Sequence, residues 1–213
     1  MKLNRSIRYA LYLIVLICIS PARADDLVSL FRAINNDNAS GVSALLARGV
    51  DPNAVDPRGQ VALYVALREG SPKVVAVLAA HPGIQLDATN AANETPLMMA
   101  ALRGDVSSTQ LLLDRGAAVN RSGWTPLHYA ASSPETKVVA LLLDRGAQLE
   151  AESPNRTTPL MMAARYGTED AALLLLARGA SAKARNDVNL NAADFARLAG
   201  RTKLAARLDE AAR

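Results

Sequence analysis

The three-residue phrase Thr-Pro-Leu occurs three times in this chain of 213 residues, and its spacing constrains the fold more than any other feature. The copies are Thr95-Pro96-Leu97, Thr125-Pro126-Leu127 and Thr158-Pro159-Leu160. An alanine pair follows each copy, and 21 residues after each threonine a leucine-rich run ends in glycine, at Gly116, Gly146 and Gly179. A period near 33 residues predicts a solenoid of stacked repeats.

The same register continues through the chain beyond residue 24. The positions equivalent to the threonine are Val28, Val61, Thr95, Thr125, Thr158 and Asn191, with steps of 33, 34, 30, 33 and 33 residues. They define six units, at about 25–56, 57–90, 91–121, 122–153, 154–186 and 187–213. The first and last units depart most from the phrase. We expect them to be caps around four full repeats, because a solenoid needs polar ends.

The phrase predicts where a helix begins. A threonine hydroxyl accepts hydrogen bonds from free amides of the first helical turn, and proline is tolerated at the first helical position. The leucine then points inward, and the alanine pair lets neighbouring helices approach closely. A second helix ends at each glycine, which adopts a left-handed conformation at little cost. Each unit therefore reads as helix, turn, helix and an outward loop, or finger.

The sequence resembles the ankyrin repeat family over residues 25–213. The segment Thr125-Pro126-Leu127-His128-Tyr129-Ala130-Ala131 matches the signature phrase of that family in full. The resemblance implies an all-α ankyrin solenoid in which His128 is structural and bonds near the threonine hydroxyl. It also implies that a protein partner binds the fingers and the exposed positions of the first helices, which form a concave face.

Carrying the register over places candidate partner-binding residues on that face. They are Arg58, Arg68, Arg103, Trp124, Arg165 and Tyr166. Arginine and tyrosine are the residue types that often dominate interface energetics. Two alternatives stay open. Trp124 has a structural interpretation, since the family often packs a tryptophan there against its own finger, and Tyr166 is either a contact residue or a bare surface aromatic.

The net charge of +4 comes from the N-terminal segment. Residues 1–24 contain four basic residues and no acid, and without them 20 basic residues balance 20 acidic ones. This segment has a basic start, an apolar stretch of eleven residues at Tyr9–Ile19, and Ala22-Arg23-Ala24 before Asp25. It is typical of a signal peptide cleaved between Ala24 and Asp25. A transmembrane anchor and lipoprotein processing at Cys18 are alternatives, although a spanning helix needs ~20 apolar residues.

The chain has one cysteine, Cys18, and it lies inside the predicted signal peptide. The mature chain would therefore form no disulfide, thiolate nucleophile or thiolate metal site. A chain without cysteine suits an oxidising compartment. We expect a bacterial protein exported to the periplasm, with secretion as the alternative and no membrane span after cleavage. The balanced mature charge argues against nucleic-acid binding.

Two departures from the repeat pattern concern the middle of the chain. Only nine residues separate Gly116 from Thr125, whereas twelve separate Gly146 from Thr158. The missing residues shorten one finger, either as neutral trimming or as a notch that admits a partner. Met98 and Met161 stand where the family has histidine. We expect both to fill the core and to lose the histidine's bond.

No catalytic pattern is present: the chain has no Gly-x-Ser-x-Gly elbow, phosphate-binding loop or dinucleotide fingerprint. His81 and His128 do not form a metal-ligand pair. We therefore expect no catalytic residue, no metal and no cofactor. The sequence favours a monomeric, non-enzymatic scaffold or adaptor for an unknown protein partner. The alternative is an inhibitor or immunity protein that blocks a periplasmic or secreted enzyme.

Overall fold

The computed structural model describes residues 21–213, which contain twelve α-helices. In chain order they are α2 (Pro21–Asn35), α3 (Ala39–Ala47), α4 (Ala62–Glu69), α5 (Pro72–Ala80), α6 (Pro96–Leu102), α7 (Val106–Asp114), α8 (Pro126–Ala131), α9 (Thr136–Asp144), α10 (Pro159–Arg165), α11 (Glu169–Ala177), α12 (Ala192–Leu198) and α13 (Thr202–Ala211). Between residues 21 and 213 there is no strand beyond a single bridge between Val55 and Val61.

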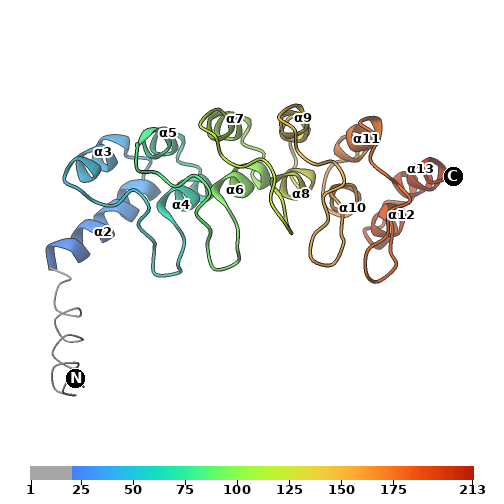
Figure 1. Cartoon of the computed structure of the whole chain (residues 1–213), viewed down its shortest axis with the longest axis horizontal. Coiled ribbons are helices and arrows are strands. Elements are labelled where there is room, and N and C mark those ends of the chain that lie inside the picture. Colours follow the sequence, from blue (N-terminus) through green and yellow to red (C-terminus); the bar gives the residue numbers. More distant parts are fainter. Residues whose placement is uncertain (1–20) are drawn as a thin grey trace, which may run out of the picture.

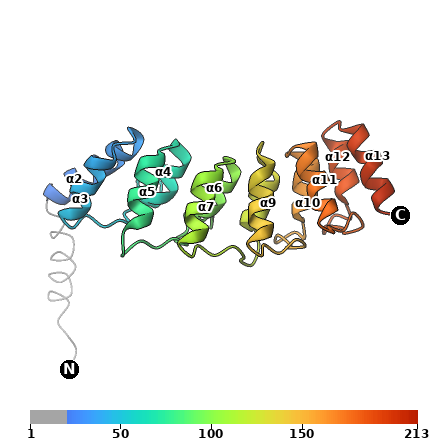
Figure 2. The ribbon, with the colours of Figure 1, turned by 90° about the horizontal axis from the view of Figure 1, so that it is seen from above.

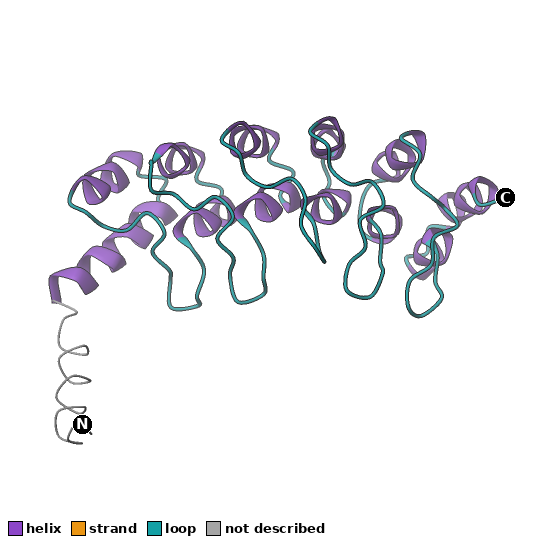
Figure 3. Ribbon diagram, in the orientation of Figure 1, coloured by secondary structure: helices purple, strands orange, loops and turns teal. Residues whose placement is uncertain are grey.

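The helices form six consecutive pairs in two rows (Figures 1 and 3). The first helices, α2, α4, α6, α8, α10 and α12, pack side by side in one row, and the second helices from α3 to α11 do the same in the other. Seen from above, the pairs follow one another along the long axis (Figure 2). The predicted all-helical solenoid is confirmed.

Long loops protrude beyond the row of first helices, on the inner side of the curve that the pairs describe (Figure 1). We call these loops fingers and name each by the helix that follows it. They are the α4 finger (50–60), the α6 finger (84–94), the α8 finger (117–124), the α10 finger (147–157) and the α12 finger (180–190). The α8 finger is the short one, and it extends less far than its neighbours.

The helix starts follow the predicted capping chemistry. Thr95 Oγ1 accepts a hydrogen bond from the Met98 amide at 3.3 Å, and Thr158 Oγ1 accepts one from the Met161 amide at 3.4 Å. Asn191 takes the same role at the start of α12. Proline occupies the first turn of α6, α8 and α10, where an amide would have no helical partner.

The glycines that follow the second helices are left-handed, as predicted. The φ angles are +92° at Gly116, +84° at Gly146 and +97° at Gly179. Gly83 departs from this pattern. The second unit has one additional residue there, α5 ends at His81 in an extended conformation, and Gly83 has no positive φ.

The core lies between the two rows and along the contacts between pairs. Leu97, Leu127 and Leu160 are at most 1% exposed, and the alanine pairs of α6, α8 and α10 are fully buried. Small residues allow the first helices to approach closely. The extreme case is Gly167, where a Cβ atom would lie 1.9 Å from the carbonyl oxygen of Ala131.

The two ends of the solenoid differ in the side chains that they expose. Arg207 in α13 is exposed and pairs with Glu169 at 2.9 Å. At the other end, α2 buries Leu30 and Ile34 but exposes Val28. Residues 1–20 of the predicted signal peptide lie outside the described residues. The backbone of α2 continues across the bond between Ala24 and Asp25, and cleavage there stays a prediction.

Candidate functional site

Arg58 and Arg68 begin the predicted set of partner-binding residues. Arg58 is exposed at the tip of the α4 finger, where the Asp56 carboxylate accepts a hydrogen bond from its amide at 2.9 Å. Arg68 lies in the last turn of α4. Its guanidinium pairs with Glu69 at 2.6 Å and also bonds the Gln60 side chain. Part of its charge is therefore neutralised within the protein.

Arg103 lies at the C-terminal end of α6, and its guanidinium donates to the backbone oxygen of Arg68 at 2.9 Å. This bond joins the ends of α4 and α6. Arg165 and Tyr166 lie at the equivalent end of α10, with the guanidinium 5.3 Å from the centre of the Tyr166 ring. In α8 the same place is taken by Ser132. The arginines therefore form two groups on either side of the fourth unit.

Trp124 ends the short α8 finger and is half-buried. Its ring meets the ring of His128 edge to face, with centroids 5.2 Å apart. This contact is with a residue of α8, and packing of Trp124 against its own finger stays a prediction. The exposed remainder of the indole also faces the cavity described below.

His128 is buried, and its two ring nitrogens have opposite roles. The Thr125 amide donates to Nδ1 at 3.2 Å, so Nδ1 accepts. Nε2 faces the Thr157 carbonyl oxygen at 2.9 Å and must carry the hydrogen. Burial holds the pKa of His128 below its ordinary value of 6.5. His128 is thus a neutral tie between the fourth unit and the α10 finger.

The two methionines at the histidine position are buried, as predicted, but they do not lose every bond. The Thr95 amide points at the Met98 sulfur at 3.4 Å, and the Thr158 amide points at the Met161 sulfur at the same distance. Sulfur is a weak acceptor that replaces Nδ1. What methionine lacks is a donor like Nε2, so the bond to the next finger is the one that is lost.

Glu94 links three units, which the sequence analysis did not foresee. The Tyr64 hydroxyl donates to Oε2 at 2.6 Å and the Tyr129 hydroxyl donates to Oε1 at 2.9 Å. Asn90 adds a third bond at 2.8 Å. Tyr64 stands at the histidine position of its unit, three residues after Val61. A tyrosine at this position was the sequence signal for a hydrogen bond to the next finger.

This network shifts the pKa values of its members. Burial and the bond to Glu94 raise the pKa of both Tyr64 and Tyr129. Burial also acts to raise the pKa of Glu94, but hydrogen bonds from Tyr64, Asn90 and Tyr129 outweigh it. The pKa of Glu94 therefore lies below its ordinary value of 4.5. The two tyrosines stay protonated and Glu94 stays ionised near neutral pH.

A cavity of about 410 Å³ lies beside the short α8 finger, between the two arginine groups. Two of its lining residues, Trp124 and Tyr166, belong to the predicted set. The full lining is Leu102, Trp124, His128, Tyr129, Ser132, Met162 and Tyr166. The structure thus gathers the aromatic members of the predicted set at one place. None of the four predicted arginines is among the lining residues: Arg58, Arg68, Arg103 and Arg165.

Comparison with known families agrees with this geometry. The family model described as ankyrin repeats (3 copies) matches residues 30–122, 83–153 and 118–192. Together these matches cover most of the chain. The chain belongs to the ankyrin repeat family. Ankyrin repeats indicate a protein–protein interaction module.

Among curated proteins, the NF-kappa-B inhibitor alpha of Sus scrofa is similar to this ankyrin repeat chain. The two are 34% identical over 96 residues, which cover 43% of this chain and 31% of the relative. The chain therefore spans about a third of the length of the relative that it matches. The likeness supports the repeat fold of the matched part.

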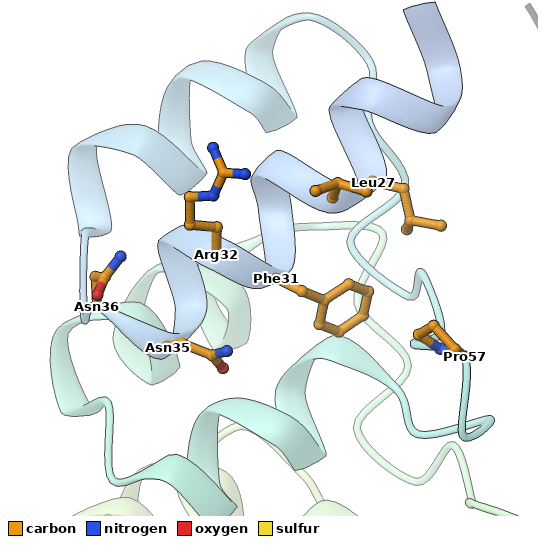
Figure 4. Close-up of a pocket in the computed structure, with 7 residues that line it drawn as sticks. Leu27, Phe31, Arg32, Asn35, Asn36 and Pro57 are labelled. Atoms are coloured by element: carbon orange, nitrogen blue, oxygen red, sulfur yellow. The ribbon is translucent and has the colours of Figure 1, made fainter. Parts of the chain in front are cut away.

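A second cavity, of about 500 Å³, lies in the first ankyrin repeat. The Phe31 ring of α2 extends toward Pro57 of the α4 finger, with Leu27 beside it (Figure 4). Within residues 21–213, no three histidine, cysteine or acidic side chains gather as a metal site. No helix in that same range has both the length and the apolar character needed to cross a bilayer.

Proposed function

We propose that the mature chain is a non-enzymatic scaffold or adaptor that binds a protein partner through its concave face. One observation carries this proposal. Every large hydrophobic side chain that is exposed in the described part of the chain belongs to a first helix, to its C-terminal end or to a finger. They are Val28, Val55, Leu102, Tyr166, Val188 and Leu198.

The opposite surface is charged and paired. Arg145 at the end of α9 pairs with Asp114 of the preceding unit at 2.9 Å, and Arg178 at the end of α11 pairs with Asp144 at 2.9 Å. Such a ladder is typical of a solvated surface. Exposed apolar side chains that gather on one face instead indicate a binding surface, and tyrosine with arginine are favoured at its energetic centre.

We further propose that this module works in the periplasm after export and cleavage between Ala24 and Asp25. The N-terminal pattern supports export, and the absence of cysteine from residues 25–213 suits an oxidising compartment. N-terminal sequencing of the protein from its native host should recover Asp25 as the first residue. Recovery of Met1, or fractionation with the cytoplasm, would contradict this proposal.

Affinity capture from a periplasmic extract of the native host, with residues 25–213 as bait, tests the binding function. The double variant Arg103→Glu with Tyr166→Ala should lose the main captured protein. The matched control changes Lys137 of α9 and Lys203 of α13, two exposed residues on second helices. If the double variant captured the partner normally and the lysine variant failed, the binding surface would be the second-helix side.

An inhibitor of a periplasmic or secreted enzyme is the second candidate. The matched relative carries the name of an inhibitor, and the same concave face would serve to block an active site. The two functions differ in whether binding stops catalysis. If the captured partner is an enzyme, an activity assay with added residues 25–213 separates them, because a scaffold leaves turnover unchanged and an inhibitor abolishes it.

A further inference from the structure

The cavity lies where the row of otherwise equal fingers is interrupted by the short α8 finger. The α8 finger spans residues 117–124, whereas each neighbouring finger is three residues longer. Figure 1 shows that its tip stops short of the others. The shorter loop leaves the ends of α6 and α10 uncovered: Leu102 is 38% exposed and Tyr166 is 59% exposed.

The walls of this cavity present apolar surface to a ligand. Three lining residues use their polar atoms on the protein itself. Tyr129 donates to Glu94, the Ser132 hydroxyl donates to the His128 carbonyl at 3.0 Å, and both ring nitrogens of His128 are bonded. Leucine, methionine and aromatic surfaces remain. A volume of about 410 Å³ is in the range of sites that enclose a small ligand or a large side chain.

The rim of the cavity carries positive charge at Arg165 and Arg121. The Arg165 guanidinium lies 5.3 Å from the ring of Tyr166, which lines the cavity, and Arg121 lies in the short finger. Arg103 adjoins Leu102, but its guanidinium turns toward α4 and donates to the Arg68 carbonyl oxygen. Within residues 21–213, none of these arginines has a carboxylate in ion-pair range. Arg121 is held by bonds to Asn93 at 2.8 and 3.0 Å, which fix its position and leave its charge unpaired.

Two acids near this region do not cancel the rim. Glu94 bonds the Tyr129 hydroxyl, but Tyr64 and Asn90 also occupy its oxygens. Glu135 accepts a hydrogen bond from the Lys137 amide at the start of α9. Arg121 and Arg165 therefore place positive charge beside the cavity, against one carboxylate that is already engaged in the interior network.

This charge pattern decides between two kinds of occupant for an aromatic pocket. Rings such as Trp124, Tyr129 and Tyr166 attract either apolar groups or cations. The guanidinium of Arg165 already lies 5.3 Å from the Tyr166 ring and repels a further cation. An apolar side chain flanked by acids meets both the walls and the rim favourably.

We infer that this cavity receives one large apolar side chain from an acidic segment of the protein partner. The inference rests on the proposed binding function and specifies its chemistry. The side chain fills the space beside Trp124, Tyr129 and Met162, and the flanking carboxylates meet the positive charge of Arg121 and Arg165. The short finger is what keeps the entrance open.

Trp124 supplies the measurement, because it is the only tryptophan of the chain and it lines the cavity. The probe is a short synthetic peptide with one central phenylalanine between glutamates, titrated into residues 25–213. Saturable change of the Trp124 fluorescence is the expected result. A peptide with central alanine, and one with lysines in place of glutamates, should each bind at least about tenfold more weakly.

Variants locate the effect. Tyr166→Ala should weaken the phenylalanine peptide about tenfold, whereas Lys137→Ala, on the second helix α9 and outside the cavity, should not. Arg165→Glu should weaken binding and reduce its salt dependence, with Lys203→Glu of α13 as the charge control. Circular dichroism and thermal melts show whether each variant is folded before its binding is compared.

Other results would overturn the inference. They are unchanged fluorescence at millimolar peptide, equal binding of the alanine peptide, or tighter binding of a trimethylammonium probe than of the acidic peptide. The binding function is separable from this cavity. If a folded Tyr166→Ala variant still captured the main partner and also bound the peptide normally, the cavity inference would fail while the proposed scaffold role stood.

Discussion

The two junctions of α8 with its neighbouring first helices are built differently. Toward α10, the His128 ring donates to the Thr157 carbonyl of a full-length finger. The backbone at Gly167 lies so close to the Ala131 carbonyl that no Cβ atom fits. This junction is tight and is linked through buried polar atoms.

Toward α6, the same helix is linked in a different way. Met98 stands at the histidine position and has no donor for the α8 finger, which is short. The link runs instead through side chains: Tyr129 donates to Glu94, and Arg121 donates to Asn93. The comparison shows that the same packing of first helices is compatible with different hydrogen bonds between units, and that the cavity beside the α8 finger is lined from both junctions.

A substitution in α8 that weakens both junctions should have the largest effect. Leu127 is fully buried, and Leu127→Ala should lower the free energy of unfolding by ~2–5 kcal/mol, the usual cost of emptying a packed leucine site. Urea denaturation of residues 25–213 measures it. Arg213→Ala, at the exposed C-terminus, should change almost nothing. Equal effects of the two substitutions would show that α8 is not at the centre of the stack.

A change confined to the tight junction should come next. In Gly167→Ala the new methyl group meets a backbone carbonyl, which cannot rotate away, so α8 and α10 must separate at a cost of about 3 kcal/mol. Gly116→Ala is the control. Its Cβ meets nothing within 4 Å, and only the left-handed backbone costs energy, about 1 kcal/mol. If Gly116→Ala were the more damaging change, the close approach at Gly167 would not be a constraint.

Much of the fold could be predicted because its determinants are local. Thr95, Pro96 and the glycine at position 116 fix helix ends through chemistry within a few residues, and the steps near 33 residues fix how units stack. Gly83 marks the limit of this reasoning. One inserted residue before it changes how α5 ends, and the spacing alone did not reveal the new conformation.

The candidate site was less predictable because its contacts are distant in sequence. Glu94 meets Tyr64 and Tyr129, which are 30 and 35 residues away. The register placed Arg68 and Arg103 on the concave face but did not show that both bond within the protein. The cavity depends on the short finger together with residues of three units, so only the assembled stack reveals it.

The junction between α6 and α8 depends on the charge of Glu94, which makes it sensitive to strong acid. Glu94→Gln weakens the bonds to Tyr64 and Tyr129 and should cost about 1–2 kcal/mol at neutral pH. The pKa of Glu94 is lower in the folded chain than its ordinary 4.5, so its contribution is present above pH 4.5 and is lost as the pH falls toward the folded value. The melting temperatures of the wild-type and Glu94→Gln proteins should therefore converge as the pH falls from 4.5 toward the folded pKa of Glu94. A constant difference down to pH 3 would show that the carboxylate is not the tie.

The junction between α8 and α10 should lose stability at milder acidity, and this effect should be the smallest of those predicted. His128 is held neutral, and burial lowers its pKa below 6.5 in the folded chain. The unfolded chain therefore takes up a proton first, and stability falls as the pH drops below about 6.5 toward the folded pKa.

His128→Met, which copies the arrangement at Met98 and Met161, leaves the Thr157 carbonyl without its donor and should cost about 1 kcal/mol at pH 7. It also removes the proton uptake, so the gap between variant and wild type should narrow between about pH 6.5 and pH 5. Because the contribution of Glu94 is lost only below pH 4.5, urea melts in these two windows assign each loss to its own junction. A gap that stayed constant to pH 5 would mean that His128 is not the neutral tie between the fourth and fifth units.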